Sequence, residues 1–260
     1  MPRRILTMPA SLAMSRWTSA KRTIGCGTVT AMDLAFAYAR FAALVNSLLL
    51  VLLLGPVSGW SPANAQSTPV RIAVLGDSLA AGYGLKPEQA FPVRLEAALK
   101  AQGRNVTVLN QGVSGDTTAG GLDRLDWMLS DKPDIVLVEL GGNDALRGLD
   151  PAVTERNLAA IVEKLQAAPV TVWLAGMMAP RNLGSDYVTA FDGLYKRIAD
   201  KYKVPLYPFI FDGVVQDPSL FQADHIHPTP KGAQIIADHL LPFVTKNLDD
   251  AQAVHRSSHP

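Results

Sequence analysis

The sequence predicts an α/β domain, a three-layer α/β/α sandwich in which a parallel sheet of five strands lies between two layers of helices. Three observations indicate this fold: short apolar segments recur along the chain, segments with helical periodicity separate them, and polar clusters follow the apolar segments. Strands that are apolar throughout are buried on both faces, which is typical of a parallel sheet covered by helices. In such sheets a ligand binds beyond the carboxyl ends of the strands.

The expected elements alternate along the chain. Strands are predicted at residues 70–75, 106–109, 135–140, 170–174 and 204–207, each a short and mainly apolar run. Helices are predicted at residues 88–100, 122–129, 151–167, 187–202 and 230–247, where apolar residues recur three or four positions apart. The first strand ends at Gly76, and Gly103 ends the first helix. No internal repeat or low-complexity linker is evident, so one domain is expected.

The N-terminal part of the chain has the pattern of an export signal. Residues 41–54 are almost unbroken apolar, and residues 61–66 have small residues spaced as a signal peptidase requires, so cleavage is expected after Ala65. The apolar run is shorter than the roughly 20 residues that span a bilayer, which favours a cleaved signal over a stable membrane anchor. Because residues 1–31 would make an unusually long basic leader, translation is expected to begin at Met32. The mature protein is thus expected to be periplasmic or secreted.

The expected organisation is an extension with signal peptide at residues 1–65, one domain at 66–248 and a polar tail at 249–260. The chain has 260 residues, 48% hydrophobic and 18% charged, which is typical of a soluble globular protein. Six of 24 basic and one of 23 acidic residues precede position 66, so the mature chain keeps 18 against 22, a net charge of −4. No basic cluster suited to a phosphate backbone is present, so no nucleic-acid partner is expected. The single cysteine, Cys26, precedes the domain, which excludes a thiol nucleophile there.

Four polar clusters occupy positions where the strand rule predicts a site. They are Gly-Asp-Ser-Leu at 76–79, Gly-Val-Ser-Gly-Asp at 112–116, Gly-Gly-Asn-Asp at 141–144 and Asp-His-Ile-His-Pro at 224–228. Ser78 alone is ambiguous, because serine often caps a helix. As a nucleophile, it would need a base to take its proton.

The candidate base lies near the C-terminus, because all five histidines stand at or after position 225. Asp224 precedes His227 by three residues, close enough to bond one ring nitrogen while the other faces Ser78. The alternatives are an ordinary turn before Pro228, or a metal site built from Asp224, His225 and His227.

Donors for an oxyanion are available in two further loops. The backbone N–H of Gly115 can approach a substrate closely because glycine lacks a Cβ, and Asn143 carries a side-chain amide beyond the third strand. Each residue has an alternative interpretation as an ordinary turn residue.

Together the four clusters, in this order and strand context, resemble the SGNH (GDSL) hydrolase family over essentially the whole mature domain. The resemblance implies a flavodoxin-like fold with Ser78 as nucleophile, His227 as base and Asp224 as its orienting acid. It also implies an oxyanion hole of the Ser78 N–H, the Gly115 N–H and the Asn143 amide. The segments at 80–84, 110–112 and 141–148 are similar to the branch of bacterial acyl-CoA thioesterases, lysophospholipases and arylesterases, whose members are commonly periplasmic. We expect a monomeric serine esterase or thioesterase without metal or cofactor.

Specificity is less defined by the sequence. Leu146, Met177 and Met178 follow the third and fourth strands and are candidates for an acyl pocket, although buried core is the alternative for the methionines. Other functions remain open: a carbohydrate or peptidoglycan O-deacetylase, and a non-catalytic lipid-binding protein of the same fold. A phosphate or nucleotide binder is disfavoured, because Asp77 would oppose an anion and no glycine-rich phosphate loop follows the first strand.

Overall fold

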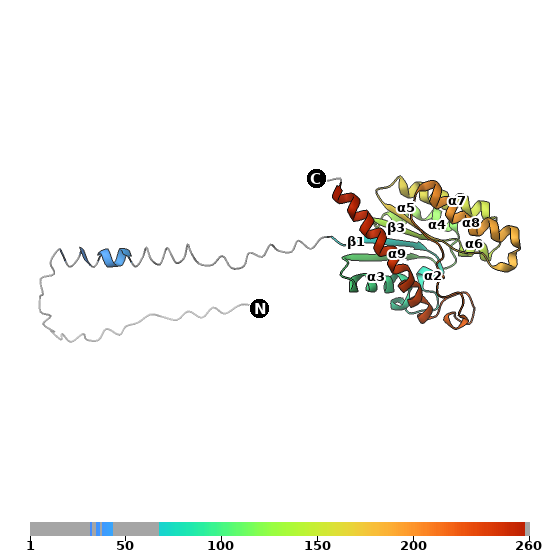
Figure 1. Ribbon diagram of the computed structural model, residues 1–260, viewed down its shortest axis with the longest axis horizontal. Helices are drawn as coiled ribbons and strands as arrows, with labels where there is room; N and C mark the ends of the chain where they lie inside the picture. Colours follow the sequence, from blue (N-terminus) through green and yellow to red (C-terminus); the bar gives the residue numbers. More distant parts are fainter. Residues whose placement is uncertain (1–31, 33–34, 37, 44–67, 258–260) are drawn as a thin grey trace, which may run out of the picture. The chain divides into compact units, whose positions relative to one another are not determined.

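The computed structural model describes residue 32 and residues 35–36, 38–43 and 68–257 (Figure 1). The chain divides into two units, Met1–Ala65 and Gln66–Pro260. The expected cleavage site after Ala65, Cys26 and most of the apolar run at 41–54 lie outside the described residues. Among the described helices, none combines the length and the apolar character needed to cross a membrane.

The second unit is built on one sheet of five parallel strands. These are β1 (Val70–Gly76), β2 (Val106–Gly112), β3 (Ile135–Glu139), β4 (Thr171–Ala175) and β5 (Leu206–Tyr207). Their order is β2-β1-β3-β4-β5, and each neighbouring pair is parallel, so the predicted fold class is confirmed. The chain first adds β2 on one side of β1 and then β3 on the other. The carboxyl ends of β1 and β3 therefore flank the point where ligands bind in sheets of this order.

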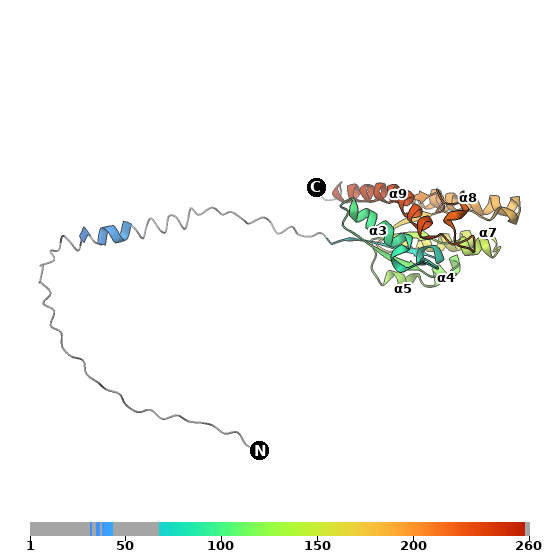
Figure 2. The ribbon, with the colours of Figure 1, turned by 90° about the horizontal axis from the view of Figure 1, so that it is seen from below.

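Helices cover the sheet in two groups. The helices of the second unit are α2 (Ser78–Ala81), α3 (Phe91–Ala101), α4 (Thr118–Asp123), α5 (Leu125–Leu129), α6 (Gly142–Leu146), α7 (Pro151–Gln166), α8 (Ser185–Tyr202) and α9 (Pro230–Ser257). Short 3₁₀ turns are η1 (Pro87–Gln89), η2 (Arg181–Leu183) and η3 (Pro218–Leu220). Helix α3 packs against α9, whereas α4 and α8 both pack against α7, with α7 and α8 side by side (Figure 1, Figure 2). The sheet lies between these groups.

The core follows from the sequence pattern. Every residue of β3 is buried, as expected for a central strand without a solvent face. Helix α8 buries Phe191, Leu194 and Ile198, whose spacing of three and four places them on one face. Tyr195 is buried beside them, and its hydroxyl donates to the Leu140 carbonyl at 2.8 Å, which satisfies its polar end.

Two predicted helices differ from the structure. The predicted helix at 122–129 is two short helices, α4 and α5, which meet at Arg124, where the side chain turns inward to bond Asp116 and the Gly76 carbonyl. The closing helix, predicted to end at Asn247, continues as α9 to Ser257, so the expected polar tail is helical over 249–257. Its extension keeps Leu248 buried and forms an ion pair between Lys246 and Asp250 one turn apart.

Candidate active site

Ser78 lies in the turn that follows β1. Asp77 caps the four-residue helix α2, its carboxylate accepting from the Leu79 amide at 3.0 Å, and Ser78 is the first residue of that helix. Only 9% of Ser78 is exposed. The turn therefore presents the Ser78 hydroxyl at the carboxyl edge of the sheet, as the sequence predicted, but inside a short helix that periodicity did not predict.

His227 and Asp224 approach Ser78 from the loop before α9. The Nε2 atom of His227 lies 2.9 Å from Ser78 Oγ, and its Nδ1 atom lies 2.7 Å from Asp224 Oδ2. The other carboxylate oxygen of Asp224 accepts from the amides of Ile226 and His227, each at 3.0 Å. The hydrogen bond from the His227 side chain is the main reason that the pKa of Asp224 falls to about 2. Asp224 is thus held ionised beside the imidazole.

The His227 ring is also fixed by a neighbouring loop that sequence reasoning missed. The ring of Tyr83 lies against it, with 4.4 Å between centroids and an angle of 37° between planes. The Gln222 side-chain amide donates to the carbonyls of Tyr83 at 2.7 Å and Pro228 at 2.9 Å, which joins the two loops. These contacts restrict the imidazole to the orientation that faces Ser78.

The two predicted oxyanion donors follow β2 and β3, Gly115 in a loop and Asn143 in the short helix α6. Gly115 has φ of +86°, a conformation that costs L-residues with a Cβ free energy. Asn143 lies in α6, and its Nδ2 atom is 3.0 Å from Asp77 Oδ2 and 2.9 Å from the Asp116 carbonyl oxygen. Asn143 therefore touches both the serine turn and the loop that carries Gly115.

Two buried carboxyl groups lie at the serine turn, Asp77 within it and Glu139 next to it. Burial raises the pKa of Asp77 to about 6, although its bonds from Leu79 and Asn143 act in the opposite direction. Glu139, fully buried at the end of β3, accepts from the Asp77 amide at 3.4 Å. Burial and the neighbouring Asp77 charge raise its pKa well above the ordinary value. The sequence showed Glu139 only as one charged residue in an apolar strand.

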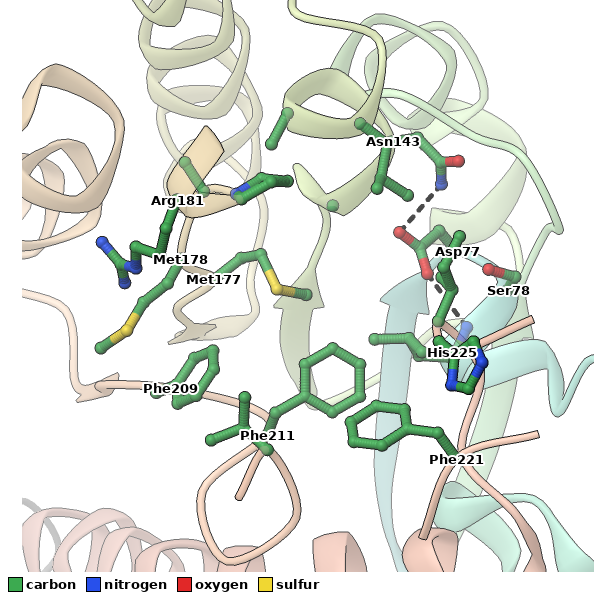
Figure 3. Close-up of a pocket in the computed structure, with 18 residues that line it drawn as sticks. Asp77, Ser78, Asn143, Met177, Met178, Arg181, Phe209, Phe211, Phe221 and His225 are labelled. Carbon is green, nitrogen blue, oxygen red and sulfur yellow. Dashed lines mark hydrogen bonds between the residues drawn. The ribbon is translucent and has the colours of Figure 1, made fainter. Parts of the chain in front are cut away.

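An apolar cavity of about 470 Å³ opens beside Ser78. It is lined by Asp77, Ser78, Leu79, Gly142, Asn143, Ala145, Leu146, Met177, Met178, Ala179, Pro180, Arg181, Phe209, Phe211, Val215, Phe221, His225 and Ile226. Figure 3 shows the Asn143 amide directed at Asp77 next to Ser78, with Met178 and Phe209 on the far side of the cavity. All three candidate specificity residues, Leu146, Met177 and Met178, are in this lining, whereas Gly115 is not.

The cavity also contains residues that the sequence did not indicate. Phe209 and Phe211 follow the very short strand β5, and Phe221 follows η3. Their position after a strand was a usable signal for the first two, but nothing local identified Phe221.

His225 does not take part in the hydrogen-bonded series of Ser78, His227 and Asp224. It has φ of +57° and lines the cavity, while Asp224 bonds only His227 of the two imidazoles. Within the described part of the chain, no group of three or more His, Cys, Asp or Glu side chains could hold a metal ion. The arrangement of Asp224, His225 and His227 suited to a metal site is therefore not formed.

A serine, a histidine and an aspartate hydrogen-bonded in series at the switch point of a doubly wound sheet define a serine hydrolase. The chain belongs to the GDSL-like lipase/acylhydrolase family, whose model matches residues 74–235.

Individual relatives agree with this membership. An arylesterase of Vibrio mimicus is 37% identical over 185 residues, covering 71% of this chain and 92% of the relative. The thioesterase 1/protease 1/lysophospholipase L1 of Escherichia coli K12 is 39% identical over 168 residues, covering 64% and 79%. The crystal structure of the esterase EstA from Pseudoalteromonas sp., inhibited by monoethylphosphonate, superposes with a TM-score of 0.67 at 33% identity, covering 69% of this chain and 99% of EstA.

Proposed function

We propose that this protein is an exported serine esterase and thioesterase that hydrolyses carboxylic esters and acyl thioesters through an acyl-serine intermediate. The observation that carries the proposal is the continuous chain from Ser78 Oγ through His227 to Asp224, with distances of 2.9 and 2.7 Å, at the mouth of an apolar cavity. Its relatives named arylesterase and thioesterase 1/lysophospholipase L1 support the same bond type.

In the acylation step, Ser78 Oγ attacks the carbonyl carbon while His227 Nε2 accepts the hydroxyl proton. The Asp224 carboxylate accepts a hydrogen bond from Nδ1–H, which keeps Nε2 free as acceptor and stabilises the imidazolium that forms. The tetrahedral intermediate then collapses, and His227 returns the proton to the departing alcohol or thiol. A water molecule, deprotonated by the same imidazole, cleaves the acyl-serine and releases the acid.

The negative charge on the substrate oxygen requires preorganised donors. The proposed donors are the backbone amides of Ser78 and Gly115 and the side-chain amide of Asn143. A primary amide has two hydrogens, and both have acceptors here, Asp77 Oδ2 and the Asp116 carbonyl. Before the oxyanion forms, these two acceptors hold the amide in place. Asn143 must release or share one of the two bonds when the oxyanion forms.

The cavity supports a substrate with an acyl chain. At about 470 Å³ it lies within the range of pockets that enclose drug-sized ligands, and it is far larger than an acetyl group needs. Met177, Phe209 and Phe211 provide an apolar wall that favours a hydrocarbon chain. An O-deacetylase acting only on acetyl groups would leave most of this cavity unfilled.

The decisive experiment compares the purified protein and its Ser78→Ala variant on p-nitrophenyl esters and acyl-CoA thioesters from acetyl to palmitoyl. We expect hydrolysis of chains longer than acetyl and complete loss in the variant, with an unchanged unfolding temperature. Retained turnover by Ser78→Ala contradicts the serine mechanism, and activity confined to acetyl substrates favours the deacetylase. A lipid carrier would show neither activity nor reaction with a fluorophosphonate.

The N-terminal pattern described above supports export, and we propose cleavage after Ala65 and a monomeric mature protein. Edman sequencing of the protein from a periplasmic fraction should begin at Gln66, and size-exclusion chromatography with light scattering should give the mass of one mature chain. An intact chain retained in the cytoplasm would contradict the export proposal.

A further inference from the structure

Two residues, Asp116 and Arg124, together connect the segments that carry the three proposed oxyanion donors. Asp116 directly follows Gly115, and its carbonyl accepts from Asn143 Nδ2 at 2.9 Å. Its carboxylate accepts from Arg124 Nε at 2.6 Å in an ion pair whose side chains are 16% and 17% exposed. Asp116 is therefore joined to Asn143 by its backbone and to Arg124 by its side chain.

Arg124 extends this connection to the serine turn. Its Nη2 atom donates at 2.9 Å to the carbonyl of Gly76, the last residue of β1 and two positions before Ser78. The same carbonyl accepts from the Val113 amide at 3.1 Å, so the loop after β2 and the Arg124 side chain both bond the end of β1 at this one oxygen. One guanidinium thus spans the segments that carry the Ser78 and Gly115 amides.

We propose, on the basis of the serine mechanism above, that Arg124 is a positioning residue that sets the spacing between the oxyanion donors of Ser78 and Gly115. A displacement of such a donor by about 1 Å can reduce a rate 10²-fold without weakening substrate binding. Arg124 contacts neither the substrate cavity nor Ser78, His227 and Asp224, so its effect on the reaction runs through Gly76 and Asp116.

The geometry explains why arginine is needed. Two separate nitrogens make the two bonds, and a lysine ammonium on its single stem cannot reproduce the rigid fork. The third nitrogen, Nη1, is buried and bonds to no described residue. A largely buried cation with an unsatisfied nitrogen contributes little to the stability of the fold, since its burial carries a desolvation cost that an apolar side chain would avoid. A role in placing the two catalytic segments accounts for it better.

A neighbouring glycine, Gly120, leaves the space that the Asp116 carboxylate occupies. A Cβ on Gly120 of α4 would lie 2.8 Å from Asp116 Oδ1, so any larger residue there would push the carboxylate away. The break between α4 and α5 at Arg124 serves the same arrangement, because it lets the guanidinium turn toward the sheet edge.

The test uses Arg124→Met, which keeps the apolar stem, and Arg124→Lys, which keeps the charge. Arg197→Met is the matched control, because Arg197 makes a two-bond ion pair with Glu155 at 2.9 and 2.6 Å between α8 and α7, away from the site. Each variant is measured for kcat and KM on p-nitrophenyl butyrate, for the unfolding temperature, and for inhibition by an alkyl trifluoromethyl ketone. That inhibitor adds to a nucleophilic serine and places an oxyanion among the donors.

For Arg124→Met we expect kcat to fall about 10- to 100-fold with KM within about twofold, and Ki for the ketone to rise by the factor lost in kcat/KM. Arg124→Lys should recover, on a logarithmic scale, less than half of the kcat that Arg124→Met loses. Arg197→Met should leave kcat and Ki unchanged. Wild-type kcat and Ki in folded Arg124→Met would overturn the proposal. If that variant does not fold, Asp116→Ala, which keeps the backbone carbonyl and removes the side-chain acceptor, carries the same expectations.

Failure of this proposal is distinguishable from failure of the proposed function. Were Ser78→Ala still active and the ketone without effect on wild-type protein, the serine mechanism itself would be wrong. An inactive Ser78→Ala variant together with an unaltered Arg124→Met variant overturns only the positioning role.

Discussion

Replacing Asp224 by asparagine isolates the part that the carboxylate plays in the reaction. The side-chain carbonyl of the introduced asparagine can still accept from the Ile226 and His227 amides, so the loop should keep its shape. Its NH₂ group, however, would face His227 Nδ1, where the carboxylate oxygen now lies at 2.7 Å. Since NH₂ can only donate, the imidazole proton moves to Nε2, and that atom can no longer accept the proton of Ser78.

The expected loss follows from this change of tautomer. Aspartate-to-asparagine exchange in a triad with intact geometry costs about 10⁴-fold in kcat, equivalent to about 5.5 kcal/mol of transition-state stabilisation. KM should change little, because Asp224 does not line the cavity.

The assay is steady-state hydrolysis of p-nitrophenyl butyrate at pH 8, with the unfolding temperature of each variant measured in parallel. Asp212→Asn is the control, since Asp212 lies 3.1 Å from the ring of His239 in a surface pair outside the site. Its kcat should equal that of the wild type. If Asp224→Asn kept kcat within tenfold of wild type, the assignment of Asp224 as orienting acid would be refuted.

Three further predictions test the donor, the pocket and the buried acid. Gly115→Ala should lower kcat at least tenfold. Gly103→Ala is the control, because Gly103 has a similar φ of +77° and lies in open space. It should cost about 1 kcal/mol of stability by urea unfolding and leave kcat unchanged. Met177→Ala should shift kcat/KM toward longer acyl chains in an ester series, and an unchanged profile would argue against Met177 as a pocket wall. Because burial raises the Asp77 pKa to about 6, protonation of Asp77 stabilises the folded state. This contribution to the free energy of unfolding is complete below about pH 4 and is lost as the pH rises through 6. Wild-type protein should therefore gain up to about 3 kcal/mol relative to Asp77→Asn between pH 8 and 4 in urea unfolding, and a constant difference would contradict the raised pKa.

The sequence was sufficient for features that depend on local pattern. Central strands are apolar along their whole length, so β3 was recognisable from residues 135–140 alone. Asp224 and His227 were found as a pair because three positions in one loop fix their separation. Ser78 could be placed at the same edge because parallel strands end together.

Features that depend on contacts between distant segments were not visible. Arg124 fitted a helical pattern, and only its bond to Gly76, 48 positions earlier, indicates another role. Glu139 looked like one polar interruption of a strand, although it lies next to the serine turn. Phe221 enters the cavity from a loop whose path no periodicity describes. In each case the role of the residue depends on a contact with a segment distant in the sequence, and composition and local spacing do not predict such contacts.

The most direct test of the central claim is the site of covalent modification by a phosphonate ester, a class of inhibitor found on the related esterase EstA. The purified protein would be inactivated with p-nitrophenyl ethylphosphonate, digested and mapped by mass spectrometry. We predict a single adduct on Ser78, stoichiometric with the activity lost, and none in the Ser78→Ala variant. An adduct on another residue, or full inactivation without modification of Ser78, would contradict the account.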